Sequence, residues 1–211
     1  MNKVYLTTIP LQGRTDLESV IYQRSTPSSP PICTRFPIIQ VIHDTLGPDD
    51  TASIIAIRQE NADTARNFQF LLDELSSLGI PSYQVSTILL PEDQHPETLI
   101  RLCQALVDAL PQVGRIYACI TYGSKSIPVV TLSALSCAQS THTELEVGGI
   151  YYGEILRQNG VRVGARLCDV STLYHLAGLV SGIHDSSTAE EVFRQLLWMS
   201  EHQEVLPEHD K

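Results

Sequence analysis

The chain has 211 residues, of which 43% are hydrophobic and 18% charged, a composition typical of globular proteins. This length predicts one well-buried domain with room for a small appendage. The net charge of −10 argues against a general nucleic-acid binder, because nonspecific affinity for nucleic acid depends on a surplus of Lys and Arg.

Membrane, secretory and metal-binding classes lose support from the same sequence. The longest apolar runs have the length of strands, and the N-terminus lacks the apolar stretch and cleavage site of a secretory signal. The five cysteines include no C-x-x-C pair, and the seven histidines lack the spacing of a metal site. We therefore expect a cytoplasmic protein with buried, reduced thiols, no membrane segment and no metal.

The hydrophobic pattern predicts strands that alternate with helices. The first strand spans 3–9, and residues 17–23 are expected to form a short strand that folds back on it. A proline-rich loop over 24–34 follows, and a helix then runs to Gly47 with Thr34 as its cap. The later predicted elements, in order, are a strand at 50–59, a helix at 61–79, a strand at 83–90, a helix at 96–110, a strand at 115–121, a helix at about 126–139, strands at 147–155 and 165–171, a helix from Ser171 or Thr172, and a last helix opened by the capping-box pair Ser187 and Glu190.

This alternation indicates an α/β fold with a mostly parallel sheet and helices on both faces. Ligands of such sheets bind outside the carboxyl ends of the strands. We therefore expect the loop after residue 9, the loop at 58–62 and the loop at 121–125 to meet at one edge.

Two stretches of this acidic chain contain no carboxylate. Residues 1–15 have none, and residues 109–143 have none where the overall content would place about four. Buried strands exclude charge, which explains part of this gap. Two such stretches could also converge on a local anion site, because a small pocket responds mainly to nearby charges.

The segment "TYGSKS" has the composition of a phosphate or nucleotide contact. It leaves a strand at Gly123 and enters a helix near Ser126, which exposes backbone N–H groups and the positive helix end. Lys125 adds a compact positive charge, and Tyr122 adds a ring on which a base could stack. The spacing matches neither a P-loop nor a G-x-G-x-x-G fingerprint, so ATP hydrolysis and NAD chemistry lose support. A tight turn with a solvated lysine is the alternative.

The block Thr121-Tyr122-Gly123-Ser124-Lys125-Ser126-Ile127-Pro128 resembles the Thr-His-Gly-x-Arg-Ser-(Leu/Ile)-Pro block of CARF domains, the CRISPR-associated Rossmann folds of type III CRISPR systems. Three further segments resemble the same family in the same order: "VYLTTIPLQ" with "ESVIYQ" behind it, "GGIYYGE" at 148–154, and "LCDVSTLYHLAGL" at 167–179. The resemblance covers residues 3–185. Tyr122 stands where the family often has histidine and Lys125 where it often has arginine, which keeps a ring and a positive charge but removes the bidentate fork.

The resemblance implies a Rossmann-like fold and a homodimer that binds a cyclic oligoadenylate, with tetra-adenylate and hexa-adenylate as the candidate rings. It implies no metal or other cofactor, and the chain has no basic helix-turn-helix for direct DNA binding. The ligand-binding residues that the resemblance implies are Thr8, Pro10, Leu11, Gln12, Thr121, Tyr122, Gly123, Ser124 and Lys125.

Family members of this kind either pass the signal to an effector or destroy it. A ring nuclease needs no metal, because a ribose 2′-hydroxyl can attack the neighbouring phosphate when the two are held in line. Lys125 would then stabilise the charge on the phosphorane, and Thr8, Ser124 or Tyr122 would orient the hydroxyl. No histidine in the loop could act as a general base, so we expect slow cleavage.

The expected domain organisation is a cyclic oligoadenylate-binding domain over residues 1–185 and a C-terminal helix and tail over 186–211. The tail pattern is amphipathic and suits packing in the core or a dimer, or a partner surface. No effector fits in so short a segment. A stand-alone sensor, a ring nuclease, a sensor domain cut from a longer protein and a non-enzymatic scaffold therefore remain open.

Overall fold

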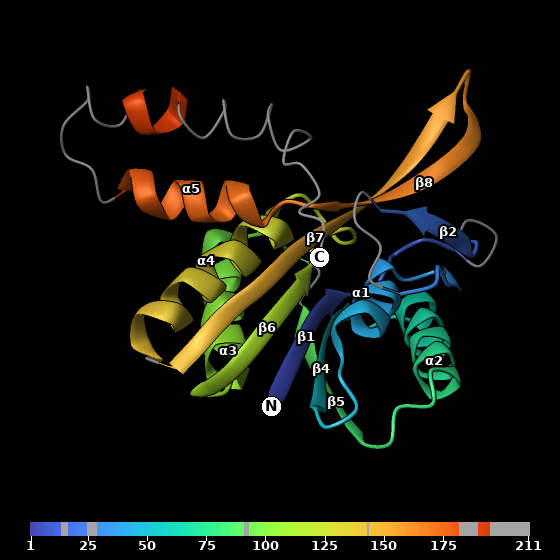
Figure 1. The fold of residues 1–211 in the computed structure, drawn as a ribbon, viewed down its shortest axis with the longest axis horizontal. Helices are drawn as coiled ribbons and strands as arrows, with labels where there is room; N and C mark the ends of the chain where they lie inside the picture. Colours follow the sequence, from blue (N-terminus) through green and yellow to red (C-terminus); the bar gives the residue numbers. More distant parts are fainter. Residues whose placement is uncertain (14–16, 25–28, 91–92, 143, 182–189, 195–211) are drawn as a thin grey trace, which may run out of the picture. The chain divides into compact units, whose positions relative to one another are not determined.

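An eight-stranded sheet organises the larger part of the chain (Figure 1). The computed structural model describes residues 1–211 except 14–16, 25–28, 91–92, 143, 182–189 and 195–211. The chain divides into two units, Met1–Val170 and Ser171–Lys211. The second unit contains α5 (Ser171–Ser181) and a helical turn at 190–194. The boundary expected at residue 185 and most of the expected C-terminal helix lie outside the described residues.

The sheet is mostly parallel, which confirms the predicted α/β class with a Rossmann-like arrangement. Its strand order is β3-β2-β8-β7-β6-β1-β4-β5. Only the β7–β8 and β2–β3 pairs are antiparallel among the described strands. The strands are β1 (Asn2–Thr8), β2 (Val20–Gln23), β3 (Cys33–Thr34), β4 (Thr51–Gln59), β5 (Tyr83–Leu90), β6 (Val113–Cys119), β7 (Glu144–Gln158) and β8 (Val161–Asp169).

Four helices cover the two faces of the sheet. Figure 1 shows α1 (Pro37–Thr45) and α2 (Ala62–Ser77) on one face, and α3 (Pro96–Ala109) and α4 (Ser126–Thr141) on the other. Tyr5, Ile54 and Tyr117 of the central strands pack in one buried cluster with residues of α1 and α2. Successive residues of a strand point to opposite faces of the sheet. The strand residues next to these three therefore face α3 and α4. The central strands are therefore buried on both faces, as their apolar sequences require.

Residues 17–23 do not fold back on the first strand, so that expectation is wrong. β2 pairs in parallel with β8 and antiparallel with β3. β1 pairs with β4 on one side and with β6 on the other. Both edges of β1 are therefore occupied. Residues 20–23 instead join the sheet as β2, next to the edge strand β3.

A long hairpin joins β7 and β8 (Figure 1). Its turn places Asn159 at φ 52° and Gly160 at φ 79°, the pair of positive angles that a type I′ turn requires. All five cysteines are free, as expected. The expectation that they are buried holds for Cys119 and is wrong for Cys33 of β3 and Cys137 of α4, which are exposed, while Cys103 and Cys168 are half-buried. Within the described residues, no helix is both long and apolar enough to cross a bilayer.

Candidate functional site

The carboxyl ends of β1, β4 and β6 lie at one edge of the sheet (Figure 1). Thr8 pairs with Ile57 of β4, and Thr7 pairs with Cys119 of β6. The segment 9–13, the loop after residue 59 and the segment 120–125 therefore begin side by side. This confirms that the three expected loops meet at the edge where parallel sheets bind ligands.

Gly123 brings the loop before α4 into contact with the end of β1. Its φ is 102°, which a side chain disfavours, and a Cβ there would lie 3.0 Å from Cγ2 of Thr8 and 3.3 Å from Cβ of Ile127. Thr8 is itself only 4% exposed. The loop backbone thus lies directly against Thr8, and two segments more than a hundred residues apart form one surface.

Lys125 stands at the start of α4. It occupies the N-cap position in the right-handed helical region, and no side chain caps this helix end. The Ile127 N–H donates to the Ser124 carbonyl at 3.0 Å, which tightens the first turn. Lys125 is exposed and forms no ion pair with a described residue. A free ammonium beside a positive helix end attracts an anion.

Gln94, in the loop between β5 and α3, is hydrogen-bonded to the start of α4. The Ser124 hydroxyl donates to Oε1 of Gln94 at 2.8 Å, and the Ser126 hydroxyl donates to the same oxygen. The two serine hydroxyls also lie 3.0 Å apart. Sequence reasoning missed Gln94, although it follows the carboxyl end of β5, where the same rule for parallel sheets would have directed attention.

Tyr122 points toward the core. Its hydroxyl donates to the Arg35 carbonyl at 2.6 Å, and its ring packs edge-on against Phe36 at a centroid distance of 6.5 Å. Burial raises the pKa of the Tyr122 hydroxyl far above its ordinary value. In this arrangement the hydroxyl is occupied and holds its proton, so the side chain fastens the loop to the segment before α1.

Thr121 fastens the loop to the neighbouring strand. Its Oγ1 accepts a hydrogen bond from the Gly153 N–H of β7 at 2.8 Å and lies 3.1 Å from Sγ of Cys119. The side chain is half-buried. Thr121 and Tyr122 therefore set the conformation of the loop, whereas Ser124 and Lys125 belong to its outer part.

The segment after β1 is buried at its first residues and exposed at the next two. Pro10 is buried, while Leu11 is 42% exposed and Gln12 is also exposed. Asn67 of α2 donates through Nδ2 to the carbonyls of Pro10 and Gln12, at 2.9 Å each. Sequence reasoning missed Asn67, because the apolar spacing of its helix drew attention to the leucines.

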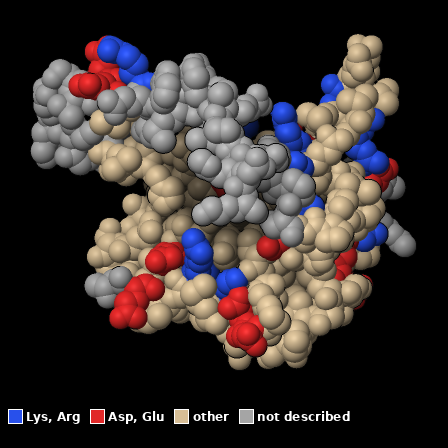
Figure 2. Space-filling view, viewed as in Figure 1, with Lys and Arg blue, Asp and Glu red and all other residues tan. Residues whose placement is uncertain are grey.

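The charge of this edge differs from that of the β7–β8 hairpin. Figure 2 shows basic side chains along the hairpin, and all of them are arginines. Arg162 pairs with Glu18 at 2.7 Å and Arg166 pairs with Glu154 at 2.6 Å, whereas Arg157 donates to the Gly160 carbonyl at 3.4 Å. Lys125 has no such partner in the described part of the chain. No group of three or more His, Cys, Asp or Glu residues in that part is arranged to hold a metal ion.

The arrangement suits a ligand with phosphate groups. It offers a free cation, a helix start and an exposed loop beside them, while the two serine hydroxyls donate to Gln94. Neither family models nor curated proteins of known function match this chain.

Proposed function

We propose that the chain is a cytoplasmic receptor for a cyclic oligoadenylate, with a ring of four or six adenylates, in type III CRISPR antiviral defence. The contact between Thr8 and Gly123 carries this proposal. It joins the two segments that, by resemblance to CARF domains, would bind the ligand. The edge where they meet is also where a parallel sheet binds ligands.

Lys125 is the phosphate-binding residue in this proposal. It is exposed and has no carboxylate partner among the described residues, so binding a phosphate breaks no existing ion pair. An ammonium binds phosphate as a point charge with three donors. Leu11 and Gln12 are the exposed side chains of the facing segment and suit contacts to the ribose and base.

A homodimer completes the site in this proposal. A ring of identical nucleotides has rotational symmetry, and a two-fold axis between two chains repeats each loop on opposite sides of it. One ring then binds two chains. Each chain contributes one Lys125 and one copy of the segment 10–12.

Slow ring cleavage is the second candidate function. Lys125 favours it, because a free cation can stabilise negative charge on a phosphorane. The hydroxyls of Ser124 and Tyr122 already donate within the protein, and Thr8 is nearly buried. These engagements favour a receptor that acts on a separate effector, with ring opening much slower than binding.

The test replaces Lys125 with alanine. Removal of a charge-assisted contact costs about 1–3 kcal/mol, which corresponds to roughly a 5- to 150-fold weaker affinity for cyclic tetra- or hexa-adenylate. The matched control is Arg101→Ala, which removes an exposed cation of α3. Calorimetric titration of both variants should show the loss for Lys125→Ala only. Equal affinities of the two variants would exclude Lys125 as the phosphate contact, and absence of ring binding by the wild-type protein would favour a scaffold.

A further inference from the structure

The buried stripe of α2 changes character along its length. Four of its residues are buried: Thr64, Asn67, Leu71 and Leu75. The two leucines lie in the core cluster shared with α1 and the sheet. The two polar residues lie in the first half of the helix, close to the edge where the loops meet. A helix that only packed against the sheet would carry apolar residues along the whole stripe.

The buried polar pair holds two loops. The Thr64 hydroxyl donates to the Gln59 carbonyl at 2.5 Å, and the Thr64 N–H donates to Oδ1 of the N-cap Asn61 at 2.9 Å. These bonds fix the loop after β4. Asn67 does the same for the loop after β1, through two bonds from one amide nitrogen to the carbonyls of Pro10 and Gln12.

Asn67 supplies both of these loop bonds from its own amide nitrogen. Its side chain is 0% exposed, and Oδ1 has no hydrogen-bond partner among the described residues. Both protons of the amide are therefore committed to loop carbonyls that lie two residues apart. Pro10 has no N–H group and cannot donate a backbone bond within the loop. The shape of residues 10–12 consequently depends on a residue of α2.

We infer that Asn67 is a positioning residue that holds the segment 10–12 in the conformation that binds the ligand. For the ligand the inference rests on the proposed function, and for the loop it rests on the two hydrogen bonds from Asn67 alone. Asn67 is buried and acts through the loop, so it touches no ligand atom itself. Loss of its amide leaves Leu11 and Gln12 attached to the sheet but free to change direction.

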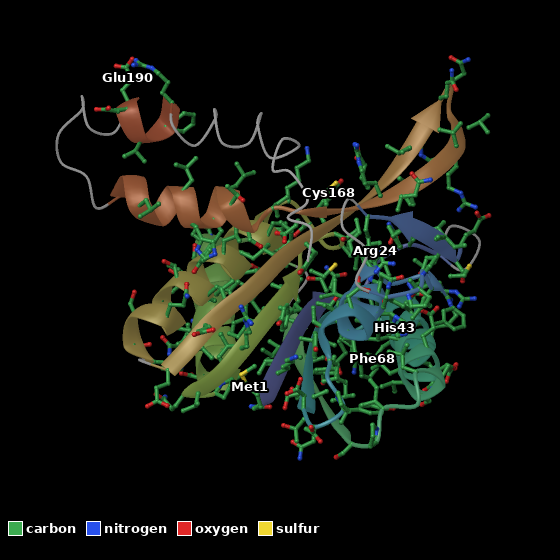
Figure 3. The ribbon with its side chains drawn as sticks, in the orientation of Figure 1. Met1, Arg24, His43, Phe68, Cys168 and Glu190 are labelled. Carbon is green, nitrogen blue, oxygen red and sulfur yellow. The ribbon has the colours of Figure 1, made fainter. Side chains whose placement is uncertain are left out.

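The experiment compares Asn67→Leu with Gln69→Leu. The leucine at 67 extends the stripe of Leu71 and Leu75 and removes both donated bonds without burying a charge. Gln69 lies two residues along the same helix on its exposed side, and its side chain bonds to Asp73 at 2.9 Å and to no other described residue, so it is the matched amide-to-leucine control. Figure 3 labels Phe68, which lies between the two positions on α2. Hydrogen–deuterium exchange of residues 6–13 and titration with cyclic tetra- and hexa-adenylate are the two readouts.

For Asn67→Leu we expect at least tenfold faster exchange in residues 9–13, unchanged exchange in residues 71–75, and at least tenfold weaker binding. For Gln69→Leu we expect wild-type values. A second variant, Asn67→Asp, should loosen the loop in the same way, because its carboxylate faces two carbonyl oxygens. Unchanged exchange in Asn67→Leu, or faster exchange with unchanged affinity, would overturn the inference. A wild-type protein that binds neither ring would refute the proposed function alone, and the exchange rates would then still decide whether Asn67 holds the loop.

Discussion

Substitution of Gly123 by alanine tests the contact on which the candidate site is built. The backbone there has a φ of 102°, and the added Cβ would lie 3.0 Å from Cγ2 of Thr8. The backbone strain costs about 1–2 kcal/mol for a residue with a side chain. Overpacking against Thr8 and Ile127 adds about 1–3 kcal/mol. We therefore expect Gly123→Ala to lower the free energy of unfolding by about 2–5 kcal/mol.

Two further variants separate the cost of backbone strain from the cost of steric overlap with Thr8. Gly79 has a φ of 66° and no atom within 4 Å of its would-be Cβ, so Gly79→Ala should cost only the strain, about 1–2 kcal/mol. Thr8→Ser removes the Cγ2 methyl group that the new Cβ would meet. Combined with Gly123→Ala, it should recover about 1 kcal/mol relative to the sum of the single changes.

The assay is urea unfolding followed by circular dichroism for the four variants and the wild type. The same proteins are titrated with cyclic oligoadenylate, and Gly123→Ala should also bind more weakly, because the loop must shift away from Thr8. A Gly123→Ala variant no less stable than Gly79→Ala, or the absence of coupling with Thr8→Ser, would refute the close approach of the two segments.

Three other predictions follow from single contacts. Tyr122→Phe removes the bond to the Arg35 carbonyl and should lower the free energy of unfolding by about 1 kcal/mol while ring affinity and any ring cleavage stay unchanged; loss of cleavage would show that the hydroxyl acts on the ligand. Hydrogen bonds from Lys3 and from the Gly47 N–H hold the pKa of Asp50 far below its ordinary value, so the stabilisation by Asp50 is complete above about pH 4 and is lost as the pH falls toward the folded-state pKa. Asp50→Asn should therefore lower the free energy of unfolding by about 1–3 kcal/mol at pH 7, and the difference from the wild type should become smaller near pH 2. Thermal unfolding across that pH range measures this difference, and a difference independent of pH would contradict the assignment. Gln94→Ala frees two serine hydroxyls and should change ring affinity without changing the exchange of residues 9–13, so an exchange change there would contradict independent anchoring of the two loops.

The alternation of strands and helices was predictable because each element carries a strong local pattern. The helix over 61–79, for instance, begins at an Asn61 cap and is followed by Gly79 with a positive φ, and the structure has α2 at Ala62–Ser77. The sheet edge that holds the loops also followed, since parallel strands share the direction of their carboxyl ends.

Strand pairing was harder to predict, because it depends on which edges are free. Nothing local in residues 17–23 says that both sides of β1 are taken by β4 and β6. The β7–β8 hairpin did carry a local signal, because the pair Asn159-Gly160 is typical of a two-residue hairpin turn. The signal was overlooked because the sheet was expected to be mostly parallel.

The direction of side chains at the site was not predictable from composition. Tyr122 has the chemistry of a stacking platform, yet its hydroxyl meets the Arg35 carbonyl inside the protein. The role of Asn67 was not predictable either, because a single amide in an apolar stripe indicates no function by itself. Its role follows only from the loop carbonyls to which it donates. Both contacts are long-range in sequence. The Tyr122–Arg35 bond joins positions 87 residues apart, and the Asn67–Pro10 bond joins positions 57 residues apart.

Titration of the wild-type protein with cyclic tetra-adenylate and cyclic hexa-adenylate, without metal and with linear oligoadenylate as control, tests the central claim most directly. Calorimetry gives the affinity and stoichiometry, and chromatography of the same samples over hours follows any conversion to linear products with a 2′,3′-cyclic phosphate. We predict tight binding of one of the two rings at one ring per two chains, with slow or no conversion. Failure to bind either ring would contradict the proposed function.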